Sequence, residues 1–475
     1  MDRMLNGARV LLGALLLILV VTGCVQTPRS SSLKDGMNDV TCMYSHTLPD
    51  DPIVYPNKPG IAMQHDFFGN TATNAYSTAD TLLAQSATTC ENAADATGYW
   101  APALRLPDGT VVPAKYQKTY YSNQPQPSNV RVPVQPFPRG LKMMAGDHMG
   151  SQPNPHISFL CTGAGYTNTI PTNCKPGQSG TQFNIGVAFP SCWDGVNLSP
   201  VMGGHDNLAY PNSSGVCPAG YPVQLPFISM NLAYAVGPMT DLSGIQLSLD
   251  PKLDAQGNVV SQEWGSLYTA HGDVFIGWRD DSRTYIAEYC MNKGRNCDKD
   301  VAYSYFEPAA DATVTGGNAS GTNFGAATSL TAQLASGSTP ESMIYLKFKI
   351  PQGAQTLPSQ YTPVYKMILD GANRTDSAST NINAYSVSTS WDETTITAAN
   401  APACSGTSAT MTVDSDVERY RSFVVTNAVN EAIAAGKDTI AFCIRGAGTR
   451  LYSFSSREGS DKPVLMLLAV NPLPY

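Results

Sequence analysis

Three segments of the sequence place a histidine beside or close to a carboxylate. They are His65-Asp66, His205-Asp206 and His271-Gly272-Asp273. Imidazole and carboxylate groups transfer protons and bind metal ions near neutral pH, and glycines beside all three segments permit the turns that functional loops need. We expect the three segments to converge on one cleft and to carry its chemistry.

Further residues are expected to complete this cleft. Asp194 adds an acid next to the ring of Trp193, and Tyr210 and Arg139 add groups that suit contacts with a substrate. The predicted catalytic residues are His65, Asp66, Asp194, His205, His271 and Asp273, and the predicted substrate-binding residues are Trp193, Tyr210 and Arg139.

Two of the chemistries that this inventory permits cleave polysaccharides. Glycoside hydrolysis needs two carboxyl groups, one protonated and one ionised, and Asp66, Asp194 and Asp273 are the candidates. Lysis by β-elimination needs a base and a group that neutralises a uronate carboxylate. The histidines or Tyr210 suit the first role and Arg139 suits the second.

The third chemistry is a divalent-metal site. Neutral imidazole binds Zn, Cu or Fe, and loops that converge can bring His65, His205 and His271 to one ion. Structural roles compete with all three interpretations, because neighbouring His and Asp side chains are often hydrogen-bonded within a fold. Trp193 beside Cys192 also suits a core position against a disulfide.

Composition and motifs exclude other functions. The net charge of -8 and the absence of a basic stripe argue against nucleic acid as a partner. The sequence contains no Gly-x-Ser-x-Gly motif and no glycine-rich phosphate loop, so an esterase nucleophile or a nucleotide site has no support. Only 14% of residues are charged, while 40 are Gly and 34 are Pro. Such a composition is typical of exported, loop-rich β domains.

The first 24 residues have the pattern of an export signal. Arg3 and Arg9 precede an apolar run over residues 11–21, which is short for a membrane span. The tetrapeptide Val21-Thr-Gly-Cys24 resembles a bacterial lipobox, which implies cleavage before Cys24 and lipidation of that residue. We expect residues 25–36 to form a flexible tether, and the membrane to be reached only through the lipid anchor.

The remaining ten cysteines are an even number and include no C-x-x-C pair, which favours disulfides over a zinc cluster. The predicted local pairs are Cys161/Cys174, Cys290/Cys297 and Cys404/Cys443.

The chain divides where its histidines end, because all six precede residue 272. After residue 303, apolar and polar residues alternate over 344–350, which indicates a strand with one buried face. A short helix is expected near residues 428–433. The predicted fold is mainly β: a loop-rich, disulfide-bonded β domain over 37–300, followed by a jelly-roll β-sandwich over 303–473.

Motifs in the second region carry a resemblance. Asp311-Ala-Thr-Val314, Trp391-Asp-Glu-Thr-Thr-Ile-Thr397 and Phe454-Ser-Ser-Arg-Glu458 occur in this order. Their succession resembles the DNRLRE-type carbohydrate-binding β-sandwich, some members of which bind acidic polysaccharides such as alginate. The resemblance implies polysaccharide as a partner. The carboxylates of Asp311 and Glu458 suggest a structural Ca²⁺ ion.

The first region also resembles a known family. Its motifs are Gln64-His-Asp-Phe-Phe-Gly-Asn70, Phe189-Pro-Ser-Cys-Trp-Asp-Gly195 and His271-Gly-Asp273. They are similar to an uncharacterised secreted family, abundant in fungi and often joined to WSC sugar-binding modules. The family often has a histidine where Gln64 stands here, and it carries no settled reaction.

These observations predict a lipoprotein of the bacterial cell envelope that acts on an extracellular or cell-wall polysaccharide. We favour glycoside hydrolysis over lysis, and we expect the C-terminal module to bring the protein to its substrate. The alternative is a non-catalytic protein for glycan binding or adhesion, whose histidines serve a metal site.

Overall fold

The computed structural model describes residues 33–471, except 129, 162–164, 173, 175–181, 202, 237–241, 415–416 and 418. Residues from Leu33 onward form one compact unit. The predicted signal peptide, the predicted lipidation site Cys24 and most of the expected tether lie outside the described residues. No helix in the described ranges is long and apolar enough to cross a membrane.

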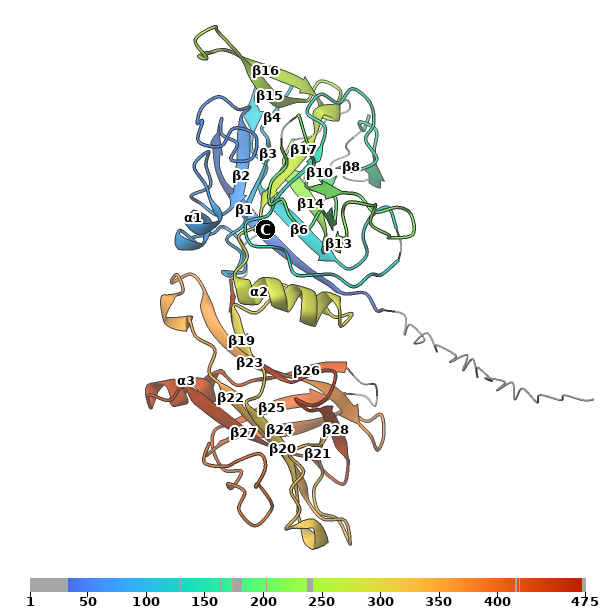
Figure 1. Cartoon of the computed structure of the whole chain (residues 1–475), viewed down its shortest axis with the longest axis vertical. Coiled ribbons are helices and arrows are strands. Elements are labelled where there is room, and N and C mark those ends of the chain that lie inside the picture. The colour runs from blue at the N-terminus through green and yellow to red at the C-terminus, as the bar shows by residue number, and fades with distance from the viewer. Residues whose placement is uncertain are drawn as a thin grey trace, which may run out of the picture. The chain divides into compact units, whose positions relative to one another are not determined.

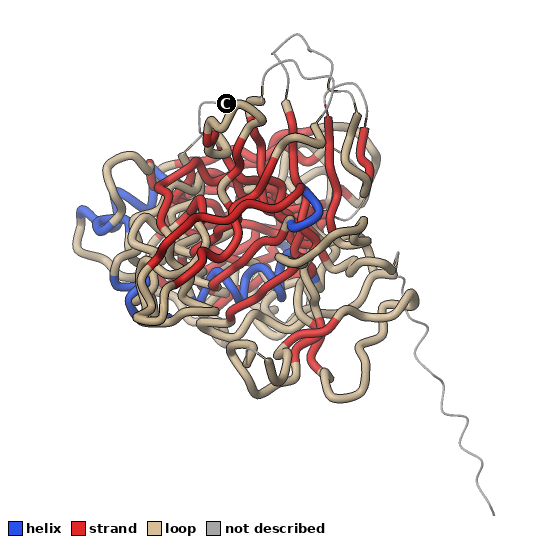
Figure 2. The backbone as a smooth tube through the Cα atoms, turned by 90° about the horizontal axis from the view of Figure 1, so that it is seen from above, coloured by secondary structure: helices blue, strands red, loops and turns tan. Residues whose placement is uncertain are grey.

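Strands dominate the fold and few helices accompany them (Figure 1, Figure 2). The strands of the N-terminal region are β1 (Met37–Leu48), β2 (His65–Gly69), β3 (Gly98–Pro102), β4 (Leu104–Arg105), β5 (Val111–Val112), β6 (Tyr116–Ser122), β7 (Lys142–Gly146), β8 (Ile157–Cys161), β9 (Gly165–Thr167), β10 (Phe183–Ala188), β11 (Cys192–Trp193), β12 (Leu208–Ala209), β13 (Val223–Gln224), β14 (Phe227–Tyr234), β15 (Gln246–Leu253), β16 (Val259–Ser266), β17 (His271–Phe275) and β18 (Asn296–Asp298).

Within the described residues, most of these strands join one eleven-stranded sheet, with β7-β17-β3-β2-β1-β6-β14-β10-β8-β9 as its main path and β18 beside β1. β1 is long enough to pair with β6 along its first part and with β2 along its second. Residues 37–43 pair with β6, and the rest of the strand turns to pair with β2. Smaller sheets, β12-β11-β13 and β16-β15-β4-β5, lie beside the main one.

The strands of the C-terminal region are β19 (Ser304–Phe306), β20 (Ala310–Thr315), β21 (Ser329–Ala332), β22 (Ser342–Lys349), β23 (Thr362–Asn373), β24 (Thr380–Val387), β25 (Ser408–Val413), β26 (Arg419–Val424), β27 (Thr439–Arg445), β28 (Tyr452–Ser455) and β29 (Val464–Val470). They form a sheet β20-β22-β27-β24-β25 and a sheet β19-β29-β23-β28-β21, to which β26 adds at β23.

The two C-terminal sheets share a core, as the predicted β-sandwich requires. The alternation over residues 344–350 buries Ile344, Leu346 and Phe348 of β22 in that core. Trp391 is also buried and packs edge-on against Tyr345, with ring centroids 6.0 Å apart. The expectation of a mainly β protein is confirmed.

The helical elements are α1 (Ala79–Ala84), η1 (Leu267–Thr269), α2 (Asp280–Tyr285), η2 (Ile286–Met291), η3 (Gly317–Ala319), η4 (Ala354–Thr356) and α3 (Thr426–Ala434). α3 is the helix expected near residues 428–433. Val425 is its N-cap residue, and the hydroxyl of Thr426, the first helical residue, accepts a hydrogen bond from the Tyr365 N–H.

Five disulfides cross-link the described part of the chain. The three predicted pairs, Cys161–Cys174, Cys290–Cys297 and Cys404–Cys443, are confirmed. Cys42–Cys90 and Cys192–Cys217 complete the set. All ten cysteines after residue 24 are therefore paired, which is consistent with an extracellular protein.

Candidate functional site

The candidate site lies on one face of the sheet formed by β2, β3 and β17 (Figure 1). Side chains two residues apart on a strand share a face, so His271 and Asp273 of β17 point the same way. Asp273 is paired with Trp100 of β3, and Phe67 of β2 is the partner of Trp100 on its other side. His65 shares the face of Phe67 and completes the group.

This face brings together one histidine from β2 and a histidine and an acid from β17. His65, His271 and Asp273 each offer a ligand atom, and these atoms all lie within 4.8 Å of one another. The two imidazole rings are 6.0 Å apart between centroids and at 89° to each other. All three side chains are buried. We call these three residues the His–Asp cluster.

Backbone carbonyls fix the tautomer of both histidines. Nδ1 of His65 lies 2.9 Å from the Asp50 carbonyl oxygen, and Nδ1 of His271 lies 2.9 Å from the Thr269 carbonyl oxygen. A carbonyl oxygen only accepts, so each Nδ1 carries the proton and donates it. The Nε2 atom of each neutral ring therefore keeps a free lone pair.

Polar atoms of the cluster lack partners, although buried polar groups are normally hydrogen-bonded. Nε2 of His65 and both carboxylate oxygens of Asp273 are buried, and none has a hydrogen-bond partner among the described residues. Burial raises the pKa of Asp273 well above its usual range. Burial also lowers the pKa values of His65 and His271 to about 4.

Two further residues stand next to the cluster. The Asp51 carboxylate is buried, accepts hydrogen bonds from the N–H groups of Ile53 and Val54 at 2.7 and 2.9 Å, and interacts electrostatically with the cluster. The ring of His148 lies 6.3 Å from that of His271, between centroids. Neither was among the predicted site residues.

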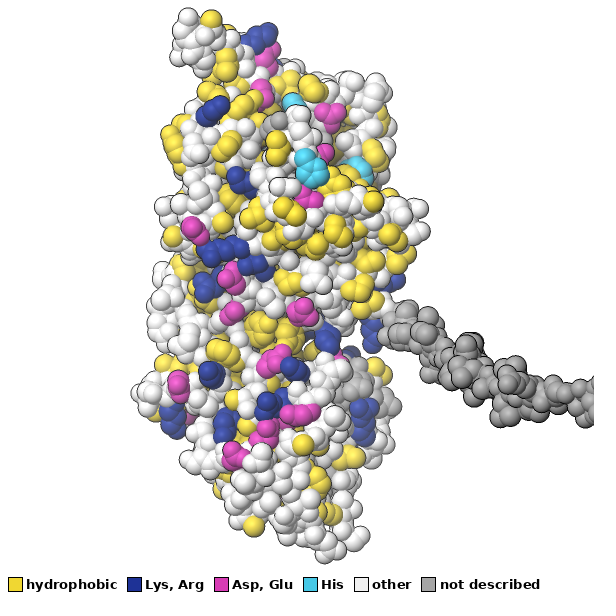
Figure 3. All heavy atoms as spheres, in the orientation of Figure 1, with side chains coloured by type: hydrophobic (Ala, Val, Ile, Leu, Met, Phe, Trp, Pro, Cys, Tyr) yellow, Lys and Arg dark blue, Asp and Glu magenta, His cyan; other side chains and the backbone are white. Residues whose placement is uncertain are grey.

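The cluster borders a cavity of about 790 Å³. His271 and Asp273 line it together with polar groups from several loops: Asp51, Tyr55, His148, Asp206, Tyr210 and Asp250. Histidine and acidic side chains lie close together on the upper part of the face shown in Figure 3. The Tyr55 hydroxyl donates to Asp250 at 2.9 Å, and burial raises the pKa of Tyr55 to about 12.

One glycine allows the strand beside His271 to approach. Gly146 of β7 is paired with His271 and has a φ of +102°. A Cβ at this position would lie 2.4 Å from the Ala270 carbonyl oxygen and 2.7 Å from the His271 Cβ. Gly272 leaves space on the opposite face of the sheet, where an added Cβ would lie only 2.5 Å from Cε of Met230.

Asp66 does not join the cluster, contrary to expectation. As the strand neighbour of His65 it points to the opposite face of β2, where its carboxylate accepts a hydrogen bond from the Thr47 hydroxyl at 2.6 Å. Burial raises the pKa of Asp66 to about 6.

Asp194 and His205 contact each other outside this cavity. Nε2 of His205 lies 2.9 Å from an Asp194 oxygen, and the other Asp194 oxygen accepts the N–H groups of Val196 and Asn197. Neither residue is among the described residues that line the cavity. Of the predicted metal trio, the structure therefore unites His65 and His271, with Asp273 in place of His205.

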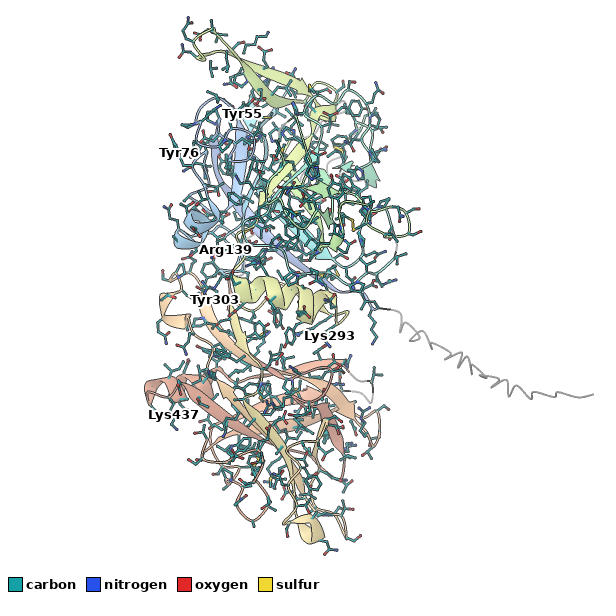
Figure 4. All side chains as sticks on the ribbon, viewed as in Figure 1. Tyr55, Tyr76, Arg139, Lys293, Tyr303 and Lys437 are labelled. Atoms are coloured by element: carbon teal, nitrogen blue, oxygen red, sulfur yellow. A yellow bond between two sulfur atoms is a disulfide. The ribbon has the colours of Figure 1, made fainter. Side chains whose placement is uncertain are left out.

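The predicted substrate-binding residues are separated. Tyr210 lines the cavity, donates its hydroxyl to the Ala188 carbonyl at 2.8 Å and stacks on His156. Trp193 donates its indole N–H to the Asn197 carbonyl and lines a separate, proline-rich hollow. Arg139 is paired with Asp80 at the surface, away from the cavity residue Tyr55 (Figure 4).

A second group of acids lies in the C-terminal region. Asp311, Glu393 and Glu458 offer oxygens within 4.8 Å of one another. The Arg457 guanidinium lies 2.7 Å from Glu393, and the Arg457 N–H donates to Asp311. An internal cation therefore already offsets part of the negative charge that would attract Ca²⁺, and the predicted ion stays a prediction.

Two family models match different parts of this chain. Residues 51–278 match the family described as Domain of unknown function (DUF1996). Residues 302–469 match Carbohydrate-binding module family 96. The chain thus joins a DUF1996 domain to a carbohydrate-binding module. Both motif resemblances agree with these matches at this level, and the cavity with its His–Asp cluster lies in the DUF1996 domain.

No curated protein matches the chain. Among solved structures, "Crystal structure of GK1651 from Geobacillus kaustophilus" is 9% identical, covers 80% of this chain and 92% of its own, and has a TM-score of 0.09.

Proposed function

We propose that the module binds a polysaccharide and that the DUF1996 domain cleaves it in the cavity. The main support for this proposal is the His–Asp cluster, whose buried polar groups lack hydrogen-bond partners and border a large cavity. The same chain also bears a carbohydrate-binding module. Buried polar groups without partners, set in a concave site, are typical of a functional centre.

Hydrolysis fits the cavity better than lysis does. A lyase that neutralises the uronate carboxylate with a cationic side chain needs Lys or Arg, and neither occurs among the described residues lining the cavity. Hydrolysis needs a proton donor for the leaving oxygen and a group that activates water. Asp206 and Asp250 supply accessible carboxyl groups for these roles, and His148 supplies an imidazole.

The proposal includes export and anchoring. The lipobox-like tetrapeptide ending at Cys24 and the five disulfides support an extracellular location. A module that holds the polymer raises its effective concentration at the cavity.

An activity screen of the full chain against neutral and uronic polysaccharides tests this function. New reducing ends without an unsaturated product indicate hydrolysis, and both signals together indicate lysis. His271→Ala should abolish turnover, whereas His205→Ala, which changes a histidine outside the cavity, should preserve it. Folded protein that is retained on a glycan but cleaves none of the panel would contradict the proposal.

Non-catalytic glycan binding is the second candidate function. It is favoured by the separation of the expected acids, because Asp66 and Asp194 both lie away from the cavity. In that case the DUF1996 domain recognises a glycan without cleaving it, and His271→Ala would weaken retention instead of turnover.

A further inference from the structure

We infer that His65, His271 and Asp273 bind one divalent ion of the first transition series. The inference rests on the proposed function only in placing the ion in the same cavity. It is carried by the geometry of the cluster, which is independent of any glycan.

When Asp273 is ionised, the free atoms of the cluster are lone-pair acceptors, not donors. Nε2 of His65 and the two oxygens of Asp273 have no hydrogen-bond partner, and Nε2 of His271 is the ring nitrogen that its carbonyl contact leaves free. One ligand atom from each of the three residues lies within 4.8 Å of those of the other two. A water molecule has only two hydrogens to offer them, whereas a single cation satisfies all of them.

The surroundings of the two histidines are those of metal ligands. A metal-bound imidazole usually donates its other ring N–H to a carbonyl or carboxylate, which orients the ring. His65 and His271 each do this, toward the Asp50 and Thr269 carbonyls at 2.9 Å. Both contacts are made to backbone carbonyls, so they orient the rings without an ion.

The donor set indicates the class of ion. Two imidazole nitrogens and one carboxylate suit Zn²⁺, Fe²⁺, Co²⁺ or Cu²⁺, while Ca²⁺ and Mg²⁺ prefer oxygen ligands. The Asp273 and Asp51 carboxylates together offset the charge of a divalent ion. Three protein ligands leave a coordination position open toward the cavity, as in catalytic sites. An ion there supplies an activated water for hydrolysis.

Direct metal binding tests this inference without any substrate. Tag-free full chain, stripped with a chelator and shown to be folded, is titrated with Co²⁺, and the bound ion is then displaced with Zn²⁺. We expect one Co²⁺ per chain, with visible absorption bands of nitrogen and oxygen ligation that disappear on Zn²⁺ addition. His65→Ala and His271→Ala should each weaken binding by more than the ~10–100-fold that loss of an outer contact costs.

Two further variants separate loss of ligands from loss of fold. Asp273→Asn keeps the shape of the buried side chain and should still weaken Co²⁺ binding, while His205→Ala should leave it unchanged. The inference is overturned if the folded, stripped wild type binds no stoichiometric Co²⁺ or Zn²⁺, or if all four variants bind like the wild type. Metal binding without glycan cleavage contradicts the proposed function alone, and glycan cleavage by a folded protein that binds no stoichiometric Co²⁺ or Zn²⁺ contradicts this inference alone.

Discussion

His65 and His271 face each other edge to face, with ring centroids 6.0 Å apart, from strands that are not neighbours in the sheet. β3 lies between β2 and β17, and its Pro102 is the strand partner of His65. The site thus depends on strand order as much as on the histidines themselves.

Gly146→Ala should damage the site through His271. The substitution places a methyl group 2.4–2.7 Å from the backbone and Cβ atoms beside it, at a φ of +102°. We expect a loss of ~1–3 kcal/mol in the free energy of unfolding and weaker Co²⁺ binding. Denaturant unfolding and the Co²⁺ titration measure the two effects.

Gly257→Ala is the matched control for this prediction. Gly257 also has a positive φ, +85°, but nothing lies within 4 Å of its added Cβ. Its cost should be only the ~1 kcal/mol of the left-handed conformation, without any change in Co²⁺ binding. Equal effects of the two substitutions would contradict the role assigned to Gly146.

Asp95 should make stability fall as the pH rises. Burial raises its pKa from 3.8 to about 7, although Tyr99 donates a hydrogen bond to it at 2.7 Å. A raised folded pKa means that the stabilising contribution is complete below about pH 4 and is lost as the pH rises toward 7. The loss from this group is on the order of 4 kcal/mol.

Asp95→Asn keeps the size of the side chain and removes its charge. The pH dependence of the free energy of unfolding between pH 4 and pH 7 should be flatter in this variant than in the wild type, by denaturant titration. Parallel pH profiles of the two proteins would show that folding does not raise the pKa of Asp95.

The two local disulfides on either side of the boundary between the domains should contribute unequally to the free energy of unfolding. Cys404–Cys443 closes a sequence separation of 39, and Cys290–Cys297 one of 7. Chain entropy gives about 4 kcal/mol for the first and about 2.5 kcal/mol for the second. Replacing both cysteines of a pair with serine should therefore lower stability more at Cys404–Cys443, measured by denaturant unfolding. The reverse order would contradict the entropic explanation.

Asp206→Asn and His148→Ala test the proton-transfer groups of the proposed hydrolase. Loss of a positioned acid or base costs ~10²–10⁴-fold in turnover. We expect a decrease of that size from at least one variant, with Co²⁺ binding retained in Asp206→Asn. Asp194→Asn is the control, because its carboxylate is bound to His205 outside the cavity. A similar decrease in all three would point to a general loss of structure.

The sequence was informative where a pattern is local. The alternation over 344–350 predicted a strand of the sandwich, and the nearby cysteines at 290 and 297 predicted their bond. Strand periodicity also explains why His271 and Asp273 lie on the same face of the sheet, whereas His65 and Asp66 lie on opposite faces. Which of these side chains share a face could be predicted only once the segments were known to be strands.

The rest of the site depends on tertiary structure. Asp51, Tyr55 and Asp250 reach the cavity from a loop and from β15, and no local motif marks them. β2 and β17 are both buried on two faces, so hydropathy shows no alternation that would reveal the direction of each side chain. The position of β3 between them also follows from long-range pairing, which a single sequence does not display.

The His–Asp cluster lies on paired strands, whereas much of the cavity wall around Asp206, Tyr210 and Tyr221 comes from loops. Strand ladders resist change, and loops accept insertions and substitutions. The two parts are thus free to evolve at different rates. Related chains are expected to keep the His–Asp cluster and to vary the residues of the cavity wall.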